Sequence, residues 1–215
     1  MNPYFKMLVK ICGIKNKETL FCCEKNRVDF FGMIFYEKSP RNINVEEAKY
    51  LQILSKELNI KGVGVFVNKE INELKKYINN LKLKFVQLHG HEDDEYLREI
   101  KKCNVKVIKK ISVRDTNDLE NIKKFRNADF FLFDYKPETN DLPGGNSKSF
   151  DWRIIIDLQI SKPWFLSGGI NFKNIQNIKE KIKPFGVDLS SGVEKELGIK
   201  NNEIINNFMS KFRDA

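Results

Sequence analysis

The sequence predicts an α/β protein, a single (β/α)8 barrel that spans residues 1–215. Two observations carry this prediction. Eight short apolar segments recur along the chain, and segments with helical periodicity lie between them. Such alternation is typical of parallel strands joined by helical crossovers. Dividing 215 residues among eight units gives about 27 residues per unit, at the small end of the size range for a closed barrel. A doubly wound open sheet is the alternative fold.

The expected strands follow one another at regular spacing. They cover residues 7–12, 30–36, 61–67, 85–90, 105–113, 129–134, 163–168 and 185–191. We expect eight helices, with helical periodicity clearest at 44–58 and 69–81 and the eighth helix at 201–212. No linker or low-complexity segment divides the chain. The long polar connection at 135–150 is of a length that is often functional.

Composition and charge limit the function classes. The 38 Lys and Arg against 29 Asp and Glu give a net charge of +9, but the lysines are scattered and form no basic tail. We therefore expect a small anionic substrate and no nucleic-acid partner, with a non-catalytic anion-binding or nucleic-acid-binding barrel as the alternative class. The chain has no apolar run of the ~20 residues that a membrane span needs and no signal-peptide pattern. We expect a soluble, cytoplasmic protein without membrane contact.

The cysteine pattern predicts free thiols and argues against a metal site. Cys12, Cys22, Cys23 and Cys103 form no CxxC pair, and the chain has only two histidines. In a reducing compartment all four stay free, and three of them are expected to be small apolar core residues.

Strand alternation assigns the side chains to two faces. In the first strand Val9 and Ile11 share one face, and Lys10 and Cys12 share the other. In the third strand we assign the valines at 63, 65 and 67 to the helix-facing side. The polar ends of the opposite faces are expected to converge at one mouth of the barrel: Cys12, Asn68, Gln87, His89, Asp134, Asp188 and Ser190.

Two glycine-containing loops predict a phosphate site. Residues 167–170 (SGGI) follow the seventh strand, and residues 190–193 (SSGV) follow the eighth. Glycines let the backbone approach an anion closely, and helix N-termini present unpaired N–H groups. Residues 193–198 are expected to form the short extra helix of such a site, and ordinary turn glycines are the alternative. The phosphate-binding candidates are Gly168, Gly169, Ser190, Ser191 and Gly192.

The motifs resemble a known family. KICGI, GMIFYEKSPRNI, GVGVFVN, VQLHG, FLFDY with GGNSKSFDW, LSGGI and GVDLSSGVEKELGIK are similar to the successive motifs of phosphoribosylanthranilate isomerase, in order, from residue 8 to about 201. The resemblance implies an Amadori rearrangement without metal or cofactor. N-(5′-phosphoribosyl)anthranilate becomes 1-(2-carboxyphenylamino)-1-deoxyribulose 5-phosphate in tryptophan biosynthesis. A general acid protonates the ribose ring oxygen, and a general base removes the proton from C2′.

The resemblance implies that Cys12 is the base and Asp134 the acid. The residues agree with these roles independently. A thiol is a base only as thiolate, and Lys10 on the same strand face favours that charged form. Asp134 follows the apolar run FFLF, and the resulting desolvation favours a protonated carboxyl group. The ordinary alternatives are a small core residue for Cys12 and a helix cap or loop ion pair for Asp134.

Four further residues are expected to contact the substrate. The resemblance matches Arg41 to an arginine that meets the anthranilate carboxylate, and a guanidinium suits a carboxylate bidentately. Asp188 matches an aspartate in the barrel mouth, with a buried ion pair to Lys10 or Arg41 as the alternative role. Lys10, on the same strand face as Cys12, is also expected to contact the substrate. His89 belongs to the LHG motif and has a structural role as its alternative.

The sequence departs from the family pattern at several positions. The loop after the sixth strand reads GGNSK, with Asn146 and Ser147, and Lys15 stands where threonine is common. A histidine-pathway aminoaldose–ketose isomerase is the competing enzyme, but it uses two aspartates, and Cys12 argues against it. The sequence leaves monomer and homodimer open.

Overall fold

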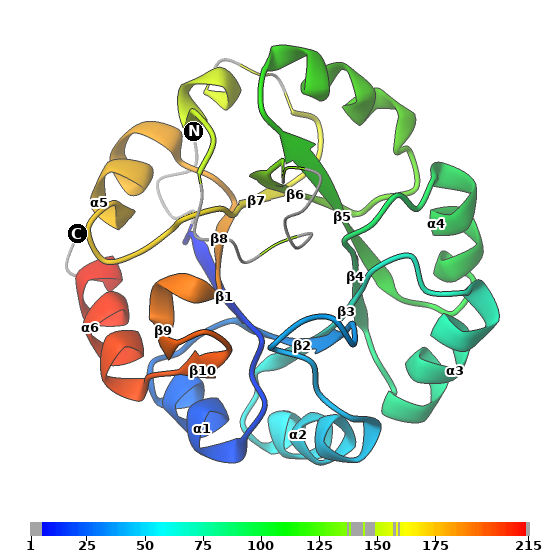
Figure 1. Ribbon diagram of the computed structural model, residues 1–215, viewed down its shortest axis with the longest axis horizontal. Coiled ribbons are helices and arrows are strands. Elements are labelled where there is room, and N and C mark those ends of the chain that lie inside the picture. The colour runs from blue at the N-terminus through cyan, green and yellow to red at the C-terminus, as the bar shows by residue number, and fades with distance from the viewer. Residues whose placement is uncertain are drawn as a thin grey trace.

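The computed structural model describes residues 6–136, 138, 144, 149–156, 158 and 160–213. Eight parallel strands form a closed barrel in the order of the chain, with helices around it (Figure 1). The strands are β1 (Leu8–Cys12), β2 (Phe30–Phe35), β3 (Lys61–Phe66), β4 (Phe85–Leu88), β5 (Lys106–Val113), β6 (Phe130–Tyr135), β7 (Trp164–Leu166) and β8 (Gly186–Leu189). Because β8 pairs in parallel with β1, with Val9 opposite Val187, the barrel is confirmed over the open sheet.

Regular helices follow the first four strands, and the helices expected at 44–58, 69–81 and 201–212 are confirmed. These helices are α1 (Lys17–Lys25), α2 (Val45–Glu57), α3 (Ile71–Leu81) and α4 (Asp94–Lys101), and α6 (Asn202–Arg213) closes the chain. Side chains fix where they begin. Asn16 accepts a hydrogen bond from the Thr19 amide, and Asn44 forms a capping box with Glu47.

A regular α-helix after every strand was expected, and this is wrong for the described residues after β5, β6 and β7. A 3-10 segment (Thr116–Lys124) follows β5, and a shorter one (Trp152–Ile155) precedes β7. After β7 comes α5 (Ile175–Asn177), which continues as a π-helical turn (Ile178–Ile182). These segments still bury apolar side chains against the barrel, which is the packing that the fold requires of them.

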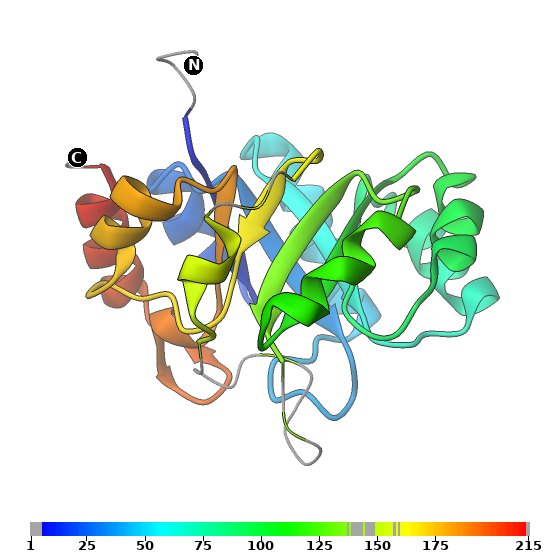
Figure 2. The same ribbon diagram turned by 90° about the horizontal axis from the view of Figure 1, so that it is seen from above.

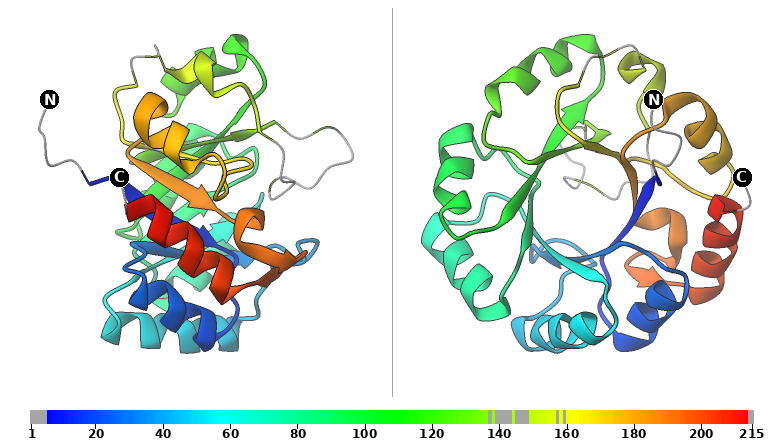
Figure 3. Two further views of the ribbon diagram at one scale, coloured as in Figure 1. Left: turned by 90° about the vertical axis from the view of Figure 1, so that its left-hand side faces the viewer. Right: turned by 180° about the vertical axis from the view of Figure 1, so that it is seen from behind.

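The carboxyl ends of all eight strands lie at one end of the barrel, and the last turn of α6 lies at the other end (Figures 2 and 3). The barrel is filled at its amino end by inward-facing aromatic rings. Phe30 lies 5.2 Å from Phe85 and 5.8 Å from Phe165 between ring centroids, in edge-to-face geometry. This apolar floor leaves the opposite mouth as the place for a pocket.

The face assignment of β3 is wrong. Val63 and Val65 point into the barrel, where they join the interior cluster of Cys12, Phe30, Ile108, Leu132 and Phe165. Phe66 packs in the outer core under the helices instead. The physical reason is that GVGVF has no polar residue on either face of the strand. The alternation of side chains therefore does not tell which face points into the barrel. Asn68 accordingly lies outside the mouth pocket, and its side chain accepts a hydrogen bond from the His91 amide at 2.7 Å.

A buried ion pair ties the ends of β3, β4 and β5 together. Lys109 Nζ donates to Glu92 Oε2 at 2.7 Å and to the Gly90 carbonyl at 2.8 Å, while Glu92 Oε1 accepts from the Asn68 amide at 2.8 Å. Both charged side chains are only 2% exposed. The pair therefore holds two loops that border the mouth.

Lys109→Met should lower the free energy of unfolding by about 3–5 kcal/mol, because it leaves the Glu92 carboxylate buried without its counter-charge. Urea unfolding measures the change. Lys102→Met is the matched control, since it removes an exposed lysine from a surface pair with Glu99 and should leave the unfolding midpoint nearly unchanged. Equal losses in the two variants would contradict the structural role of Lys109.

Candidate active site

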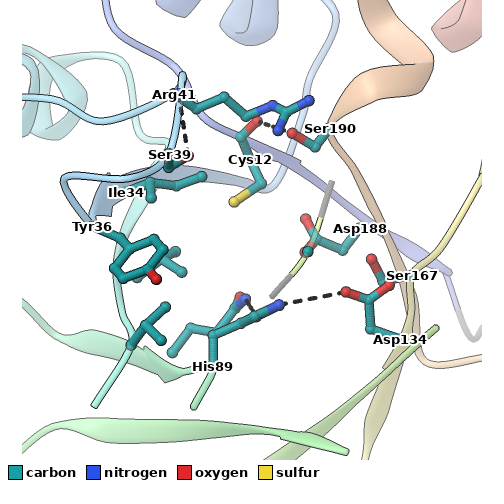
Figure 4. A pocket seen from close by; sticks show the side chains of 14 residues that line it. Cys12, Ile34, Tyr36, Ser39, Arg41, His89, Asp134, Ser167, Asp188 and Ser190 are labelled. Atoms are coloured by element: carbon teal, nitrogen blue, oxygen red, sulfur yellow. Dashed lines mark hydrogen bonds and ion pairs between the residues drawn. The ribbon is translucent and has the colours of Figure 1, made fainter. Parts of the chain in front are cut away.

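A pocket opens at the carboxyl ends of the strands. Figure 4 shows Cys12 with its sulfur directed into this pocket, Asp134 and His89 across from it, and Asp188 between Cys12 and Asp134. Residues at the ends of most of the strands contribute to the lining: Cys12, Ile34, Tyr36, Ser39, Arg41, Val65, Val67, Gln87, His89, Asp134, Gly144, Ser167, Asp188 and Ser190. Cys12 and Asp134 thus share one cavity, although 122 positions separate them in the sequence.

Cys12 ends β1 beside a buried ion pair. Lys10 Nζ donates to Asp188 Oδ1 at 2.9 Å, and the two side chains are 0% and 5% exposed. Burial raises the pKa of the Cys12 thiol, and the Lys10 charge and hydrogen bond oppose this without cancelling it. The pKa of Lys10 is raised, since Asp188 and Cys12 outweigh the effect of burial. Lys10 is therefore a fixed cation beside the sulfur, and Asp188 forms the Lys10 ion pair that the sequence left open as an alternative.

Asp134 lies near the end of β6 and is 5% exposed. Its Oδ1 accepts from the Tyr135 amide at 2.9 Å, and its Oδ2 lies 3.4 Å from His89 Nε2. Gly144 covers the pair closely. A Cβ atom built on it would lie 2.6 Å from His89 Nε2 and 3.3 Å from Asp134 Oδ2, so only glycine fits this approach without displacing the imidazole.

The Arg41 side chain is buried and forms a bidentate ion pair, so it is not a solvent-exposed charge on a loop. Its Nε and Nη2 donate to the two carboxylate oxygens of Glu194 at 2.7 and 2.8 Å. Lys200 Nζ donates to the same carboxylate at 2.5 Å and to Ser190 Oγ at 3.2 Å, and Ser190 Oγ donates to the Cys12 carbonyl at 3.2 Å. The chain of contacts connects the segment after β2 to the backbone of Cys12.

The extra helix expected at 193–198 is wrong. Residues Ser191–Val193 form one 3-10 turn, and β9 (Glu194–Glu196) then pairs antiparallel with β10 (Ile199–Lys200). Gly198, with φ of 82°, makes the turn of this hairpin. The hairpin turns Glu194 toward Arg41 and Lys200.

The two glycine loops come into contact at the mouth. Gly168 and Gly169 follow β7 with φ values of 88° and 71°, in the region that favours glycine. A Cβ on Gly192 would lie 2.0 Å from the Ile170 carbonyl oxygen, so the loop after β8 passes directly against the loop after β7. Ser190 lines the pocket beside them. The phosphate candidates therefore occupy one side of the mouth.

Similarity to known proteins identifies the family of this chain. Residues 9–211 match the family model described as N-(5'phosphoribosyl)anthranilate (PRA) isomerase. The chain belongs to this isomerase family. It is 38% identical to the N-(5'-phosphoribosyl)anthranilate isomerase of Clostridium acetobutylicum over 207 residues, which is 95% of this chain and 97% of that protein. It is 36% identical to the enzyme of that name from Chelativorans sp. strain BNC1, over 96% of each chain.

Solved structures of the isomerase family show the same barrel. The phosphoribosyl anthranilate isomerase from Thermotoga maritima superimposes with a TM-score of 0.88 at 33% identity, covering 98% of this chain and 100% of that one. An isomerase structure in complex with reduced 1-(o-carboxyphenylamino)-1-deoxyribulose 5-phosphate gives a TM-score of 0.85 at 32% identity, with the same coverage.

Some pocket residues of this isomerase were not singled out from the sequence. Tyr36, Ser39 and Ser167 line the cavity, and Glu194 and Lys200 support it. Tyr36 and Ser167 each follow a strand directly, which is the signal that could have found them. The pairing of Glu194 with Arg41 joins positions 153 residues apart and has no local signal. Asn146 and Ser147 lie outside the described residues.

Metal clusters and membrane-spanning helices are both absent from the part of the chain that the structure describes. The described residues contain no cluster of three or more His, Cys, Asp and Glu side chains arranged to hold a metal ion. Every helix in this part of the chain is too short or too polar to cross a lipid bilayer.

Glu194 makes the stability of this arrangement depend on pH. Burial alone raises its pKa, but Arg41 and Lys200 outweigh burial and lower the pKa from the usual 4.5 to about 2. The ionised carboxylate therefore stabilises the fold above about pH 4.5, and this stability is lost as the pH falls toward 2.

Glu194→Gln should be less stable than the unchanged protein at pH 7, by on the order of 2–3 kcal/mol. The difference should shrink as the pH falls, because the unchanged protein then loses the contribution that the variant lacks already. The midpoints of urea unfolding at a series of pH values measure this difference in stability. A difference that is constant with pH would rule out Glu194 as the titrating group.

Proposed function

We propose that this chain converts N-(5′-phosphoribosyl)anthranilate into 1-(2-carboxyphenylamino)-1-deoxyribulose 5-phosphate, with Cys12 as general base and Asp134 as general acid. The chain is an isomerase of the tryptophan-biosynthesis family, so what is proposed beyond that membership is the substrate contacts and the roles of these residues. The observation that carries the proposal is that the thiol and the carboxyl group line one pocket, beside the two glycine loops.

The acid step uses Asp134. Its protonated carboxyl group gives a proton to the ribose ring oxygen, and the C1′–O bond breaks to form the protonated Schiff base of the open-chain aldose. Tyr135 N–H holds one carboxyl oxygen, and His89 lies at the other, so the group has a fixed orientation. Gly144 lies directly against both side chains and lines the same pocket.

The base step uses Cys12. Its thiolate takes the proton from C2′, and the electron pair moves to give a neutral enolamine, which tautomerises to the ketone. Lys10 stabilises the thiolate against the cost of burial. After both steps Asp134 has lost one proton and Cys12 has gained one, so one proton must return from Cys12 to Asp134 before the next turnover.

The remaining side chains of the pocket are proposed to bind the substrate. The loops with Gly168, Gly169, Ser190, Ser191 and Gly192 would hold the phosphate through backbone N–H groups, as glycine loops at the end of a barrel do. Arg41 would attract the anthranilate carboxylate at the mouth, and its pairing with Glu194 fixes the guanidinium in place.

Other features fit the same function. A cytoplasmic location is proposed because a reducing compartment keeps Cys12 as a thiol, and the described cysteines are all free. The relative from Thermotoga maritima is described as dimeric, with variants generated as monomers. We propose a monomer or a homodimer for this chain.

The experiment is complementation of a tryptophan auxotroph that lacks this isomerase step, with Cys12→Ala as the matched control. Growth with the unchanged chain and no growth with the variant supports the proposal. A direct assay with the anthranilate and the histidine-pathway aminoaldoses separates the two isomerases. Failure of the purified protein to turn over phosphoribosylanthranilate would overturn the assignment.

A further inference from the structure

Lys110 is a buried charge at the mouth that the proposed chemistry does not use. It is 6% exposed and lies two residues beyond Ile108, whose side chain belongs to the barrel interior, so Lys110 faces inward on β5. Gln87 pairs with Ile108 across β4 and β5, and His89 and Lys110 each lie two residues further along the same face. Both side chains line a second cavity, of about 630 Å³, beside the mouth pocket.

Each ring nitrogen of His89 faces a different partner, Gln87 at Nδ1 and Asp134 at Nε2. Gln87 Nε2 lies 2.9 Å from His89 Nδ1, and with the amide in this orientation its N–H donates and Nδ1 is the acceptor. The ring proton then sits on Nε2, which lies 3.4 Å from Asp134 Oδ2 (Figure 4). In this tautomer His89 donates toward the proposed acid.

The charges around His89 come from three strands. Lys110 approaches from β5, Asp134 from β6 and Asp188 from β8, while Tyr36 after β2 and Val67 after β3 line the two cavities beside His89. Burial and the Lys110 charge lower the pKa of His89, and they outweigh the two aspartates, which raise it. Without a cation at position 110, only burial would lower the pKa of His89 against the two carboxylates, which raise it.

We propose that Lys110 and Gln87 together hold His89 as a neutral imidazole with its proton on Nε2, so that His89 orients Asp134 without taking the proton that Asp134 transfers. The catalytic part of this statement rests on the proposed function. An imidazolium at this distance would stabilise the ionised carboxylate and leave no proton for the ribose ring oxygen. Lys110 and Gln87 are positioning residues here, since they act through His89.

Nitrogen NMR of the imidazoles tests the proposal directly and needs no activity. The chain has only two histidines, and His91→Gln assigns the signals of His89. We expect the Nε2–H tautomer in the unchanged protein, with a titration midpoint below the ordinary 6.5. An Nδ1–H tautomer, or an imidazolium at neutral pH, would overturn the proposal whether or not the protein is an isomerase.

Three lysine variants test the charge. Lys110→Met should raise the His89 midpoint by about one pH unit, and Lys110→Arg should restore it, because the position keeps its charge. Lys124→Met is the control, an exposed lysine on the wall of the same cavity, and should leave the midpoint in place. The acidic limb of the kcat profile should move to higher pH in Lys110→Met alone. A midpoint that does not move in Lys110→Met, or that moves equally in Lys124→Met, would overturn the role of Lys110.

Discussion

Cys12→Ala is expected to lower kcat by about 10²–10⁴-fold while substrate binding largely survives. Alanine removes the group that takes the proton from C2′ and leaves the Lys10–Asp188 ion pair and the glycine loops in place. The site loses its base but keeps its proposed phosphate contacts. Steady-state kinetics gives kcat, and titration with the reaction product gives the dissociation constant.

Two comparisons make the Cys12 result specific. Cys23→Ala removes another fully buried thiol, on α1, and should leave kcat unchanged within a small factor. Because burial raises the pKa of Cys12, the titration of this thiol should shape the alkaline side of the kcat profile in the unchanged protein, and this contribution should disappear in Cys12→Ala. Loss of binding together with turnover, or loss of neither, would rule out Cys12 as the base.

Asp134→Asn is expected to lower kcat by a similar factor of about 10²–10⁴ with the fold intact. Asparagine keeps the size of the side chain and can still accept from the Tyr135 amide, but it has no proton to transfer to the ribose ring oxygen. The barrel around it, with Leu132 and Phe133 on the two faces of β6, does not change. Kinetics measures the loss, and circular dichroism checks the fold.

Asp118→Asn is the control for Asp134. Asp118 lies on the wall of the neighbouring cavity and pairs with Lys136, and it is outside the pocket that contains Cys12. Its replacement tests whether any lost carboxylate near the mouth slows the reaction. Near-normal turnover in Asp134→Asn, or an equal loss in Asp118→Asn, would remove Asp134 from the role of acid.

The sequence was most informative where a strand has one polar and one apolar face. In β1, β4, β6 and β8 the polar positions are in phase, and the structure brings Cys12, His89, Asp134 and Asp188 into one pocket as predicted. Closure of the barrel makes this possible, because all eight carboxyl ends meet at one mouth. The same reasoning failed for β3, where both faces are apolar or glycine.

The sequence by itself predicted the barrel and the thiol and carboxyl group of the proposed chemistry, because periodicity and motif order are local properties of the chain. The pairing of β8 with β1 decided against the open sheet. Only the tertiary structure decided which way β3 faces, that residues 194–200 form a hairpin, and that Arg41 is bound by Glu194. It also brought Lys110 and His89 to the wall of the same cavity. These features depend on contacts between distant segments, and barrel closure and the charges it buries fix them.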